Sequence, residues 1–264
     1  MAAQNAPLCR VASDDEIANP LRTVDGAGWL GKSIRGKKLL CLAAGGGRQS
    51  ALYAAAGADV TVLDISPAML ARDRDSARQR GHSIRVVEGS MDDLSMFAAA
   101  SFEIVIHPVS TCYFPQVVPV YREVARVIGE GGLYISQHKT PQSLQTRPTP
   151  DPAGHYVMDH AYYRDDPIAD RGDDSLPARR LRESGAIEYL HRWEELIGGL
   201  CRCGFVVEDL AEPDHHDEHA QAGTFAHRCH FIAPYVRIKA RRRTGDMDGG
   251  GPNARPTVPK IHLS

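Results

Sequence analysis

The sequence predicts an α/β fold built on a doubly wound, mostly parallel sheet. Short apolar runs alternate with helical stretches along much of the chain, three consecutive glycines follow the first apolar run, and an aspartate ends the second. Apolar runs bounded by turn residues are typical of strands buried on both faces. Their alternation with helices is typical of parallel sheets, in which helices connect successive strands.

The first strand and the turn that follows it are the most sharply defined elements. A strand is expected at residues 39–44, followed by the turn Gly45-Gly46-Gly47 and by an Ala-rich helix at 50–56. Glycine at such a turn leaves room for a ligand to approach the backbone, because no Cβ intervenes. A second buried strand is expected at 59–63, and Asp64 follows it directly.

The next helix has a recognisable start. Ser66 is expected as its N-cap and Pro67 as its first helical residue, which are the positions that these residue types favour. The later elements continue the alternation. They are predicted as strands at 84–87, 102–106, 133–136, 205–210 and 229–238 and helices at 117–128 and 187–203.

The domain organisation follows from the same pattern. With 264 residues and a soft prior of ~150 residues per domain, we expect one large domain at 37–238, preceded by a lead-in segment at 1–36. Within it, residues 141–186 are rich in proline and aromatic side chains, which favours a lid or substrate loop. Residues 239–264 are basic at their start and rich in glycine and proline, so a disordered tail is expected.

Composition excludes several classes of protein. The 31 Lys and Arg nearly balance the 33 Asp and Glu, so a protein that binds polyanions through bulk positive charge is not expected. No apolar run approaches the ~20 residues of a membrane span. The first ten residues lack a signal-peptide pattern, and the six dispersed cysteines indicate reduced thiols. We therefore expect a cytoplasmic protein.

The glycine turn and Asp64 together indicate an adenosine-containing cofactor. A carboxylate at the end of the second strand, 19 residues after Gly45, can accept hydrogen bonds from ribose hydroxyls. The nicotinamide fingerprint G-x-G-x-x-G would need glycine where Ser50 stands, so a nicotinamide-dependent oxidoreductase is a distant alternative. The chain has no P-loop.

Several segments, taken in order, resemble the class I S-adenosylmethionine-dependent methyltransferases. Residues 39–47 are similar to the family's first motif, 62–70 to its ribose-binding segment and 88–94 to its adenine-contacting loop. Residues 102–106 resemble its fourth strand, and 123–133 the helix and fifth strand beyond. The resemblance implies a seven-stranded sheet whose last strand is antiparallel, with S-adenosylmethionine bound over the carboxyl ends.

The resemblance also implies a set of cofactor-binding residues. Asp64 would hold the ribose and Ile65 would pack on the adenine. The full set comprises Ala43, Gly45, Gly46, Gly47, Asp64, Ile65, Ser90, Met91, Asp92 and His107. The chain departs from the family pattern at Cys41, where an acidic residue is common, at Ala43 in place of glycine, and at Ser90 in place of aspartate.

The acceptor is expected to be a small molecule. The segment His107-Pro108-Val109-Ser110 lacks the Asn/Asp-Pro-Pro-aromatic motif of enzymes that methylate exocyclic amines of adenine or the glutamine amide. A histidine can act as general base near neutral pH, and His107 and His138 lie just beyond the carboxyl ends of consecutive predicted strands, where open sheets bind ligands. The residues expected to line the acceptor pocket are Tyr113, Tyr156, Tyr162 and His191.

Alternative interpretations remain at this stage. His107 can be a strand-end residue whose backbone lines the cofactor pocket. The chain can bind S-adenosylmethionine without catalysis, or methylate RNA with the help of its basic C-terminal tail. The run 214–219 contains three histidines and three acidic residues, but without helical H-E-x-x-H spacing a solvated loop is favoured over a metal site. No metal is predicted, and the oligomeric state is left open.

Overall fold

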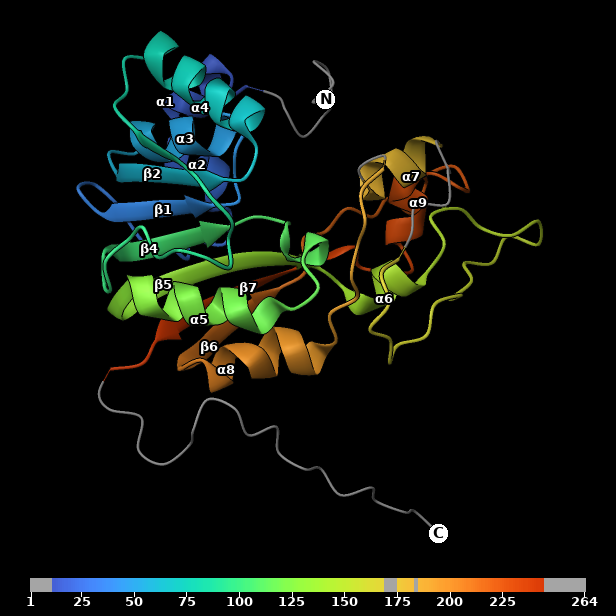
Figure 1. The fold of residues 1–264 in the computed structure, drawn as a ribbon. Helices are drawn as coiled ribbons and strands as arrows, with labels where there is room; N and C mark the ends of the chain where they lie inside the picture. The colour runs from blue at the N-terminus through green and yellow to red at the C-terminus, as the bar shows by residue number, and fades with distance from the viewer. Residues whose placement is uncertain (1–10, 169–174, 183–184, 245–264) are drawn as a thin grey trace.

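The computed structural model describes residues 11–168, 175–182 and 185–244. Its seven-stranded sheet has the order β3-β2-β1-β4-β5-β7-β6 (Figure 1). Strands β1 to β5 run parallel to one another, and β7 is antiparallel to both β5 and β6. The strand bounds are Lys38–Leu42 (β1), Asp59–Asp64 (β2), Arg85–Glu88 (β3), Phe102–His107 (β4), Ile128–Lys139 (β5), Phe205–Ala211 (β6) and Tyr235–Arg242 (β7). The predicted α/β fold is confirmed.

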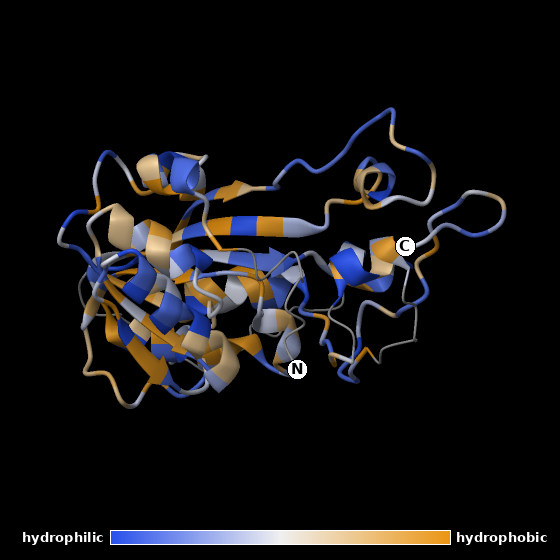
Figure 2. Ribbon diagram, turned by 90° about the horizontal axis from the view of Figure 1, so that it is seen from above, coloured by the Kyte–Doolittle hydropathy of each residue, from blue (hydrophilic) through white to orange (hydrophobic). Residues whose placement is uncertain are grey.

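Helices cover both faces of the sheet. Helix α5 (Val117–Val127) buries Val117, Val120, Tyr121, Val124 and Val127, which recur at helical spacing on one side. It packs with α8 (Gly199–Arg202) over one face. The opposite face is covered by α2 (Pro20–Val24), α3 (Arg48–Ala55) and α4 (Pro67–Gln79). Orange, hydrophobic stretches run along several of the strands in Figure 2, as expected for a sheet buried between two layers.

The start of α4 agrees with the prediction. The Ser66 hydroxyl accepts a hydrogen bond from the Met69 N–H, and Pro67 is the first helical residue. Because β2 ends at Asp64, the capped helix begins almost directly after the strand. Asp64 is therefore held between a strand and a helix.

The segment expected as a lead-in packs into the same core as the sheet. It contains α1 (Asp14–Ala18) and α2, and the Asp25 carboxylate accepts hydrogen bonds from the backbone N–H groups of Trp29 and Leu30. Trp29, Leu30 and Ile34 are buried against β1 and α3. The described part of 1–36 thus packs against the sheet and α3.

Two predicted elements differ in the C-terminal part. The helix expected at 187–203 begins only at Glu194, as a π-helical turn (Glu194–Gly198) followed by α8, because Glu188 is drawn into an antiparallel bridge with Ile168. The strand expected at 229–238 begins at Tyr235, after helix α9 (Phe225–Cys229).

Strand β7 also runs to Arg242, beyond the expected boundary at 238, because it is paired on both sides, with β5 and β6. Residues 239–242 are therefore not a disordered tail. Residues 245–264, which make up most of that predicted tail, lie outside the described part of the chain.

A lobe lies beyond the carboxyl end of β5. We define the lobe as residues 141–168, 175–182 and 212–234; it contains α6 (Pro141–Gln145), α7 (Leu176–Leu181) and α9 (Figure 1). The Thr140 N–H donates to the Pro234 carbonyl, so the start of the first lobe segment lies beside the end of the last one. Most of the insertion predicted at 141–186 is part of it.

Candidate active site at the carboxyl edge of the sheet

The Asp64 carboxylate faces the glycine bend that follows β1. Its Oδ2 accepts a hydrogen bond of 2.9 Å from the Gly45 N–H, and its Oδ1 accepts one of 2.9 Å from the Ser66 N–H. The Asp64 carbonyl in turn accepts from the Gly89 N–H at 3.1 Å, which joins the loop after β3 to the same point. The ends of β1, β2 and β3 are thus tied together around one carboxylate.

Glycine is required in the bend by the packing of the protein itself. A Cβ on Gly45 would lie 2.7 Å from Met69 Cβ and 2.8 Å from Asp64 Oδ2, and one on Gly47 would lie 2.8 Å from the Arg72 carbonyl oxygen. Gly47 also has φ of +85°. Ala43, which stands where the family pattern has glycine, adopts φ of +47°, a conformation that non-glycine residues rarely take.

Asp73 is a site residue that the sequence analysis did not identify. It lies on α4, is fully buried, and accepts hydrogen bonds from the N–H groups of Gly46 (2.8 Å) and Gly47 (3.1 Å) and from the Ser50 hydroxyl. Burial raises its pKa above the ordinary aspartate value. The available signal was an aspartate three residues after the buried Leu70 and four before the buried Ala77, on the apolar face of a helix.

The loop after β3 supplies the other expected cofactor residues. The Ser90 hydroxyl donates to the Asp92 carboxylate, and the buried Met91 sulfur lies 3.9 Å from the Ser110 hydroxyl of the loop after β4. Ile65 is 71% exposed directly beside Asp64. The connected loops thus offer a carboxylate for the ribose and an apolar side chain for the adenine. They also offer a hydroxyl and a carboxylate at the edge of the adenine. This set fits an adenosine-containing cofactor.

His107, at the end of β4, is buried with both ring nitrogens engaged. Its Nδ1 lies 2.7 Å from the Tyr134 hydroxyl and its Nε2 lies 2.7 Å from the Ser110 hydroxyl. Burial lowers the pKa of His107 to about 3, so the ring is neutral at pH 7. The geometry does not offer a free imidazole for proton abstraction here.

His138 and His191 are likewise enclosed. The ring nitrogens of His138 lie 2.8 Å from the hydroxyls of Thr111 and Ser136, and His191 Nε2 donates to the Thr111 carbonyl at 2.9 Å. Burial lowers the pKa of both imidazoles. The three histidines form part of a buried polar layer beneath the carboxyl edge, and the catalytic role expected for His107 and His138 is not supported by this arrangement.

The expected acceptor residues are divided between two places. Tyr113 ends the short helix Thr111–Tyr113, with Lys139 Nζ 5.7 Å from its ring centre. The Tyr162 hydroxyl accepts a hydrogen bond from the Trp193 N–H, and its ring packs near Leu190. Tyr156 instead contacts α9 in the lobe, where its hydroxyl lies 3.0 Å from His227 Nδ1 and its ring contacts Phe231.

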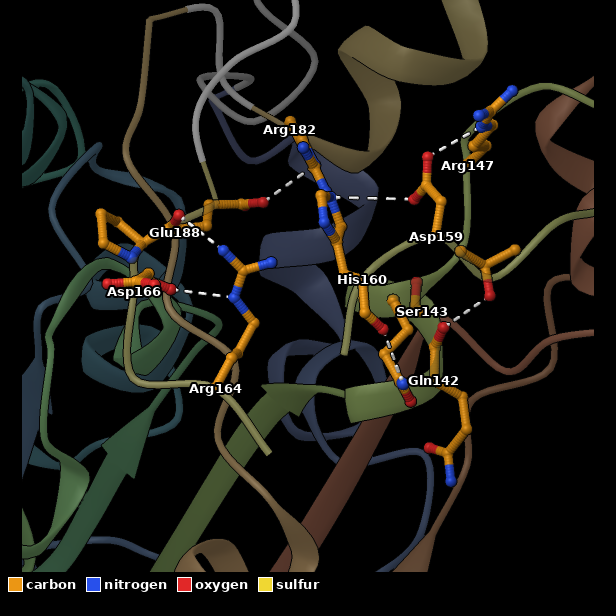
Figure 3. A network of polar contacts seen from close by, with 12 residues as sticks. Gln142, Ser143, Arg147, Asp159, His160, Arg164, Asp166, Arg182 and Glu188 are labelled. Carbon is orange, nitrogen blue, oxygen red and sulfur yellow. Dashed lines mark hydrogen bonds and ion pairs between the residues drawn. The ribbon is translucent and has the colours of Figure 1, made fainter. Parts of the chain in front are cut away.

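Ion pairs fasten the lobe to the sheet. Lys139, at the end of β5, pairs with Glu188, whose second oxygen lies 3.0 Å from Arg182 Nε. Figure 3 shows Arg164 nearby, donating to the carbonyl oxygens of Asp166 and Pro167. It also shows Arg147 and His160 on either side of Asp159. The Lys139–Glu188–Arg182 contacts join the insertion to the end of β5, whereas the contacts of Arg164 and Asp159 lie within the insertion.

The basic residues at the end of β7 are engaged within the fold. Arg241 pairs with Glu208, which also lies 3.1 Å from Lys239, and Arg242 donates to the carbonyls of Ala125 and Gly204. The His-rich run 214–219 is mostly exposed. Over the described ranges, no cluster of His, Cys, Asp or Glu has the arrangement of a metal site. In the same part of the chain, no helix combines the length and apolar character needed to cross a bilayer.

Comparisons with known proteins agree with this geometry. The family model described as a methyltransferase domain matches residues 40–136. The chain is 39% identical over 183 residues to a Bacillus subtilis (strain 168) protein named uncharacterized methyltransferase YbaJ, covering 68% of this chain and 69% of that protein. It is also 33% identical over 135 residues to 24-methylenesterol C-methyltransferase 2 of Oryza sativa subsp. japonica, which covers 50% of this chain but only 36% of the rice protein.

Solved structures share the fold. An S-adenosylmethionine-dependent methyltransferase from Mesorhizobium loti superposes with a TM-score of 0.64 at 21% identity, covering 80% of this chain and 93% of that one. A protein described as a methyltransferase of the same kind from Listeria monocytogenes gives 0.63 at 15% identity, covering 87% and 96%. The similarity to the Bacillus protein extends beyond the family model and spans over two thirds of both chains. The chain therefore belongs to the class I S-adenosylmethionine-dependent methyltransferases.

Proposed function

We propose that the protein transfers the methyl group of S-adenosylmethionine to a small-molecule acceptor held between the glycine bend and the lobe. The observation that carries this proposal is the orientation of the Asp64 carboxylate toward the Gly45 N–H. Each carboxylate oxygen has a further lone pair after bonding to Gly45 or Ser66, so both can accept from ribose hydroxyls. The bound cofactor supplies an activated methyl group, so the protein's task is positioning and exclusion of water.

The remaining cofactor residues follow from their positions. Ile65 offers an exposed apolar side chain for the adenine, and the loop formed by Ser90, Met91 and Asp92 borders its edge. The bend formed by Gly45, Gly46 and Gly47, with Ala43 before it, faces the methionine part of the cofactor. The backbone of His107 lies at the adjoining strand end, and its buried ring orients the Ser110 loop.

The acceptor is assigned to the side of the lobe. His191 bonds to Thr111, and the Tyr189 N–H donates to the Cys112 carbonyl, so the segment after the insertion meets the helix that contains Tyr113. Tyr113 and His191 lie on these converging segments, and the Tyr162 hydroxyl bonds to the Trp193 N–H of the second one, so these three are the candidates for contacts with the acceptor. Tyr156 instead contacts His227 and Phe231 of the lobe. The rice relative is named for a sterol, which supports a small molecule as acceptor.

Methylation of RNA has less support than methylation of a small molecule. Arg241 and Arg242 are bonded to the protein's own acceptors, so they are not presented as a basic patch for phosphates. Only an experiment distinguishes an enzyme from a protein that binds S-adenosylmethionine without catalysis. The proposal predicts both binding and transfer.

The test measures where the methyl group goes. Calorimetry first establishes binding of S-adenosylmethionine, and cofactor labelled in its methyl group is then incubated with the protein and either a small-molecule cell extract or total RNA. We expect label in the small-molecule fraction. Label confined to RNA, or binding without transfer to either, would contradict the proposal.

Asp64→Ala gives the matched site variant. It should weaken cofactor binding by ~1.5 to 3 kcal/mol, the loss expected for charge-assisted hydrogen bonds, with a corresponding fall in transfer. Asp59→Ala, at the exposed opposite end of the same strand, should leave binding unchanged. Thermal unfolding checks that both variants fold, and unchanged affinity in a folded Asp64→Ala protein would refute the ribose assignment.

A further inference from the structure

We propose that Asp73 is a positioning residue that sets the shape of the glycine bend and makes the site prefer the cationic cofactor over its uncharged product. This inference rests on the proposed function, in which the bend faces the methionine part of S-adenosylmethionine. Asp73 lies on α4, which packs on β2 and β3, and it does not need to touch the cofactor. Its influence passes through the backbone that it binds.

The hydrogen bonds fix which way the bend faces. The N–H groups of Gly46 and Gly47 both point to Asp73. A trans peptide unit is planar, with its carbonyl opposite its N–H, so the carbonyls of Gly45 and Gly46 point away from Asp73. One side of the bend therefore has its donors occupied by a buried carboxylate, and the other side presents backbone oxygens.

The cradle around the carboxylate supplies hydrogen-bond donors that favour an ionised group. Asp73 accepts three hydrogen bonds, two from the bend and one from Ser50 in the first turn of α3, and it has no exposed surface. Backbone and hydroxyl donors stabilise the charged form, although burial opposes it. An apolar residue here would leave two buried N–H groups without an acceptor.

The charge of Asp73 is felt at the strand ends on both sides of the bend. It helps to raise the pKa of the buried Cys41 thiol on β1, and the charge of Asp64 at the end of β2 helps to raise the pKa of Asp73. Two carboxylates thus act on the same short stretch of backbone, and each contributes negative potential there. Cys41 itself supplies no charge.

This potential distinguishes the two forms of the cofactor. S-adenosylmethionine carries a positive sulfonium that is lost when the methyl group leaves, whereas S-adenosylhomocysteine has no net charge. A fixed negative charge stabilises the first more than the second. Asp73 is therefore expected to favour binding of the methyl donor and release of the demethylated product.

The experiment compares the affinities of the two ligands by calorimetry in wild type, Asp73→Asn, the double variant Asp73→Asn with Ser50→Asp, and Asp75→Asn. Asp73→Asn removes the charge at nearly constant shape, and the double variant returns a carboxylate from the other end of the same hydrogen bond. Asp75 is an exposed aspartate on the same helix and serves as the control.

We expect the preference for S-adenosylmethionine over S-adenosylhomocysteine to fall by about tenfold in Asp73→Asn, the order of one partly screened charge interaction. It should return in the double variant and stay unchanged in Asp75→Asn. Equal losses for both ligands in Asp73→Asn would show a merely structural role and overturn the inference. A purely structural effect on the bend would not change this ratio.

Two further outcomes are decisive. If Asp73→Asn alone does not fold, the double variant carries the test, and a ratio below that of the wild type overturns the inference. If the wild-type protein binds neither ligand, the proposed function fails. If it binds both and the ratio is insensitive to Asp73, only the present inference fails.

Discussion

Lys139 and Glu188 form an ion pair that is closed off from solvent, with side chains 6% and 0% exposed. Lys139 ends β5, whereas Glu188 follows the insertion and is bridged through its backbone to Ile168. Arg182, at the end of α7, adds a second cation at 3.0 Å from Glu188. One carboxylate therefore joins the sheet, the insertion and the segment that leads to the acceptor side.

Glu188→Gln should destabilise the protein by ~3 to 5 kcal/mol, because it leaves the buried Lys139 without its counter-charge. Lys139→Gln should destabilise the protein less, since Glu188 keeps its ion pair with Arg182. Urea unfolding measures both free energies. Glu103→Gln, which breaks an exposed pair with Lys37, is the control and should change stability by less than ~1 kcal/mol. Equal small effects for both pairs would show that the buried pair does not hold the lobe.

The buried histidines predict a loss of stability in mild acid. Burial lowers the pKa of His107 from its ordinary value of 6.5 to about 3, so between these values the unfolded chain binds a proton that the native protein does not. Stability conferred by the neutral ring is present above pH 6.5 and falls below it by ~1.4 kcal/mol per pH unit for this group. His138 and His191 shift in the same direction and steepen the fall.

The measurement is the slope of the unfolding free energy against pH between 6 and 5. In His107→Gln this slope should decrease by ~1.4 kcal/mol per pH unit, the contribution of one proton bound only by the unfolded chain. This decrease is expected whatever the change in overall stability. His219→Gln removes an exposed histidine and serves as the control. The same slope in His107→Gln and wild type would mean that His107 is protonated in the native protein.

Arg228 should be essential to the lobe. Its guanidinium is fully buried and donates to the carbonyls of Ser143, Thr146 and Arg147 at the end of α6, and burial lowers its pKa to about 10. Arg228→Met should destabilise the protein by ~3 kcal/mol or more, because it leaves several buried carbonyls without donors.

Hydrogen exchange locates this effect. In Arg228→Met the amides of α6 and α9 should exchange faster while those of β1, β2 and β4 keep their protection, and binding of S-adenosylmethionine should persist. Arg243→Gln, an exposed arginine past the end of β7, provides the comparison. Loss of protection across the whole sheet would show that the lobe and the sheet unfold as one unit.

The parts of the fold that are set by local pattern could be predicted from the sequence. The strand ending at Asp64, the Ser66 cap and the glycine bend each depend on residues close together in the chain, and the structure has all three. The relation of Asp64 to Gly45 was within reach because parallel strands bring their carboxyl ends to one edge.

What the sequence did not reveal depends on tertiary contacts. Asp73 looked like any polar residue of an amphipathic helix until the bend was placed against it. The burial of His107 could not be predicted from its position in the sequence, because Tyr134 and Ser110, from other segments, enclose it. The extension of β7 past residue 238 arises from pairing on both of its edges, which overrides the polarity of its last residues.

The lobe is built from two insertions. One follows Lys139 at the end of β5, and the other connects Ala211 at the end of β6 to Tyr235 at the start of β7. The bend, Asp64 and the Ser90 loop come instead from β1, β2 and β3. In the function proposed, the half that grips the donor and the half that selects the acceptor can therefore diverge separately. Exchanging the lobe between relatives at these two junctions would exchange the choice of acceptor and leave binding of the methyl donor unchanged.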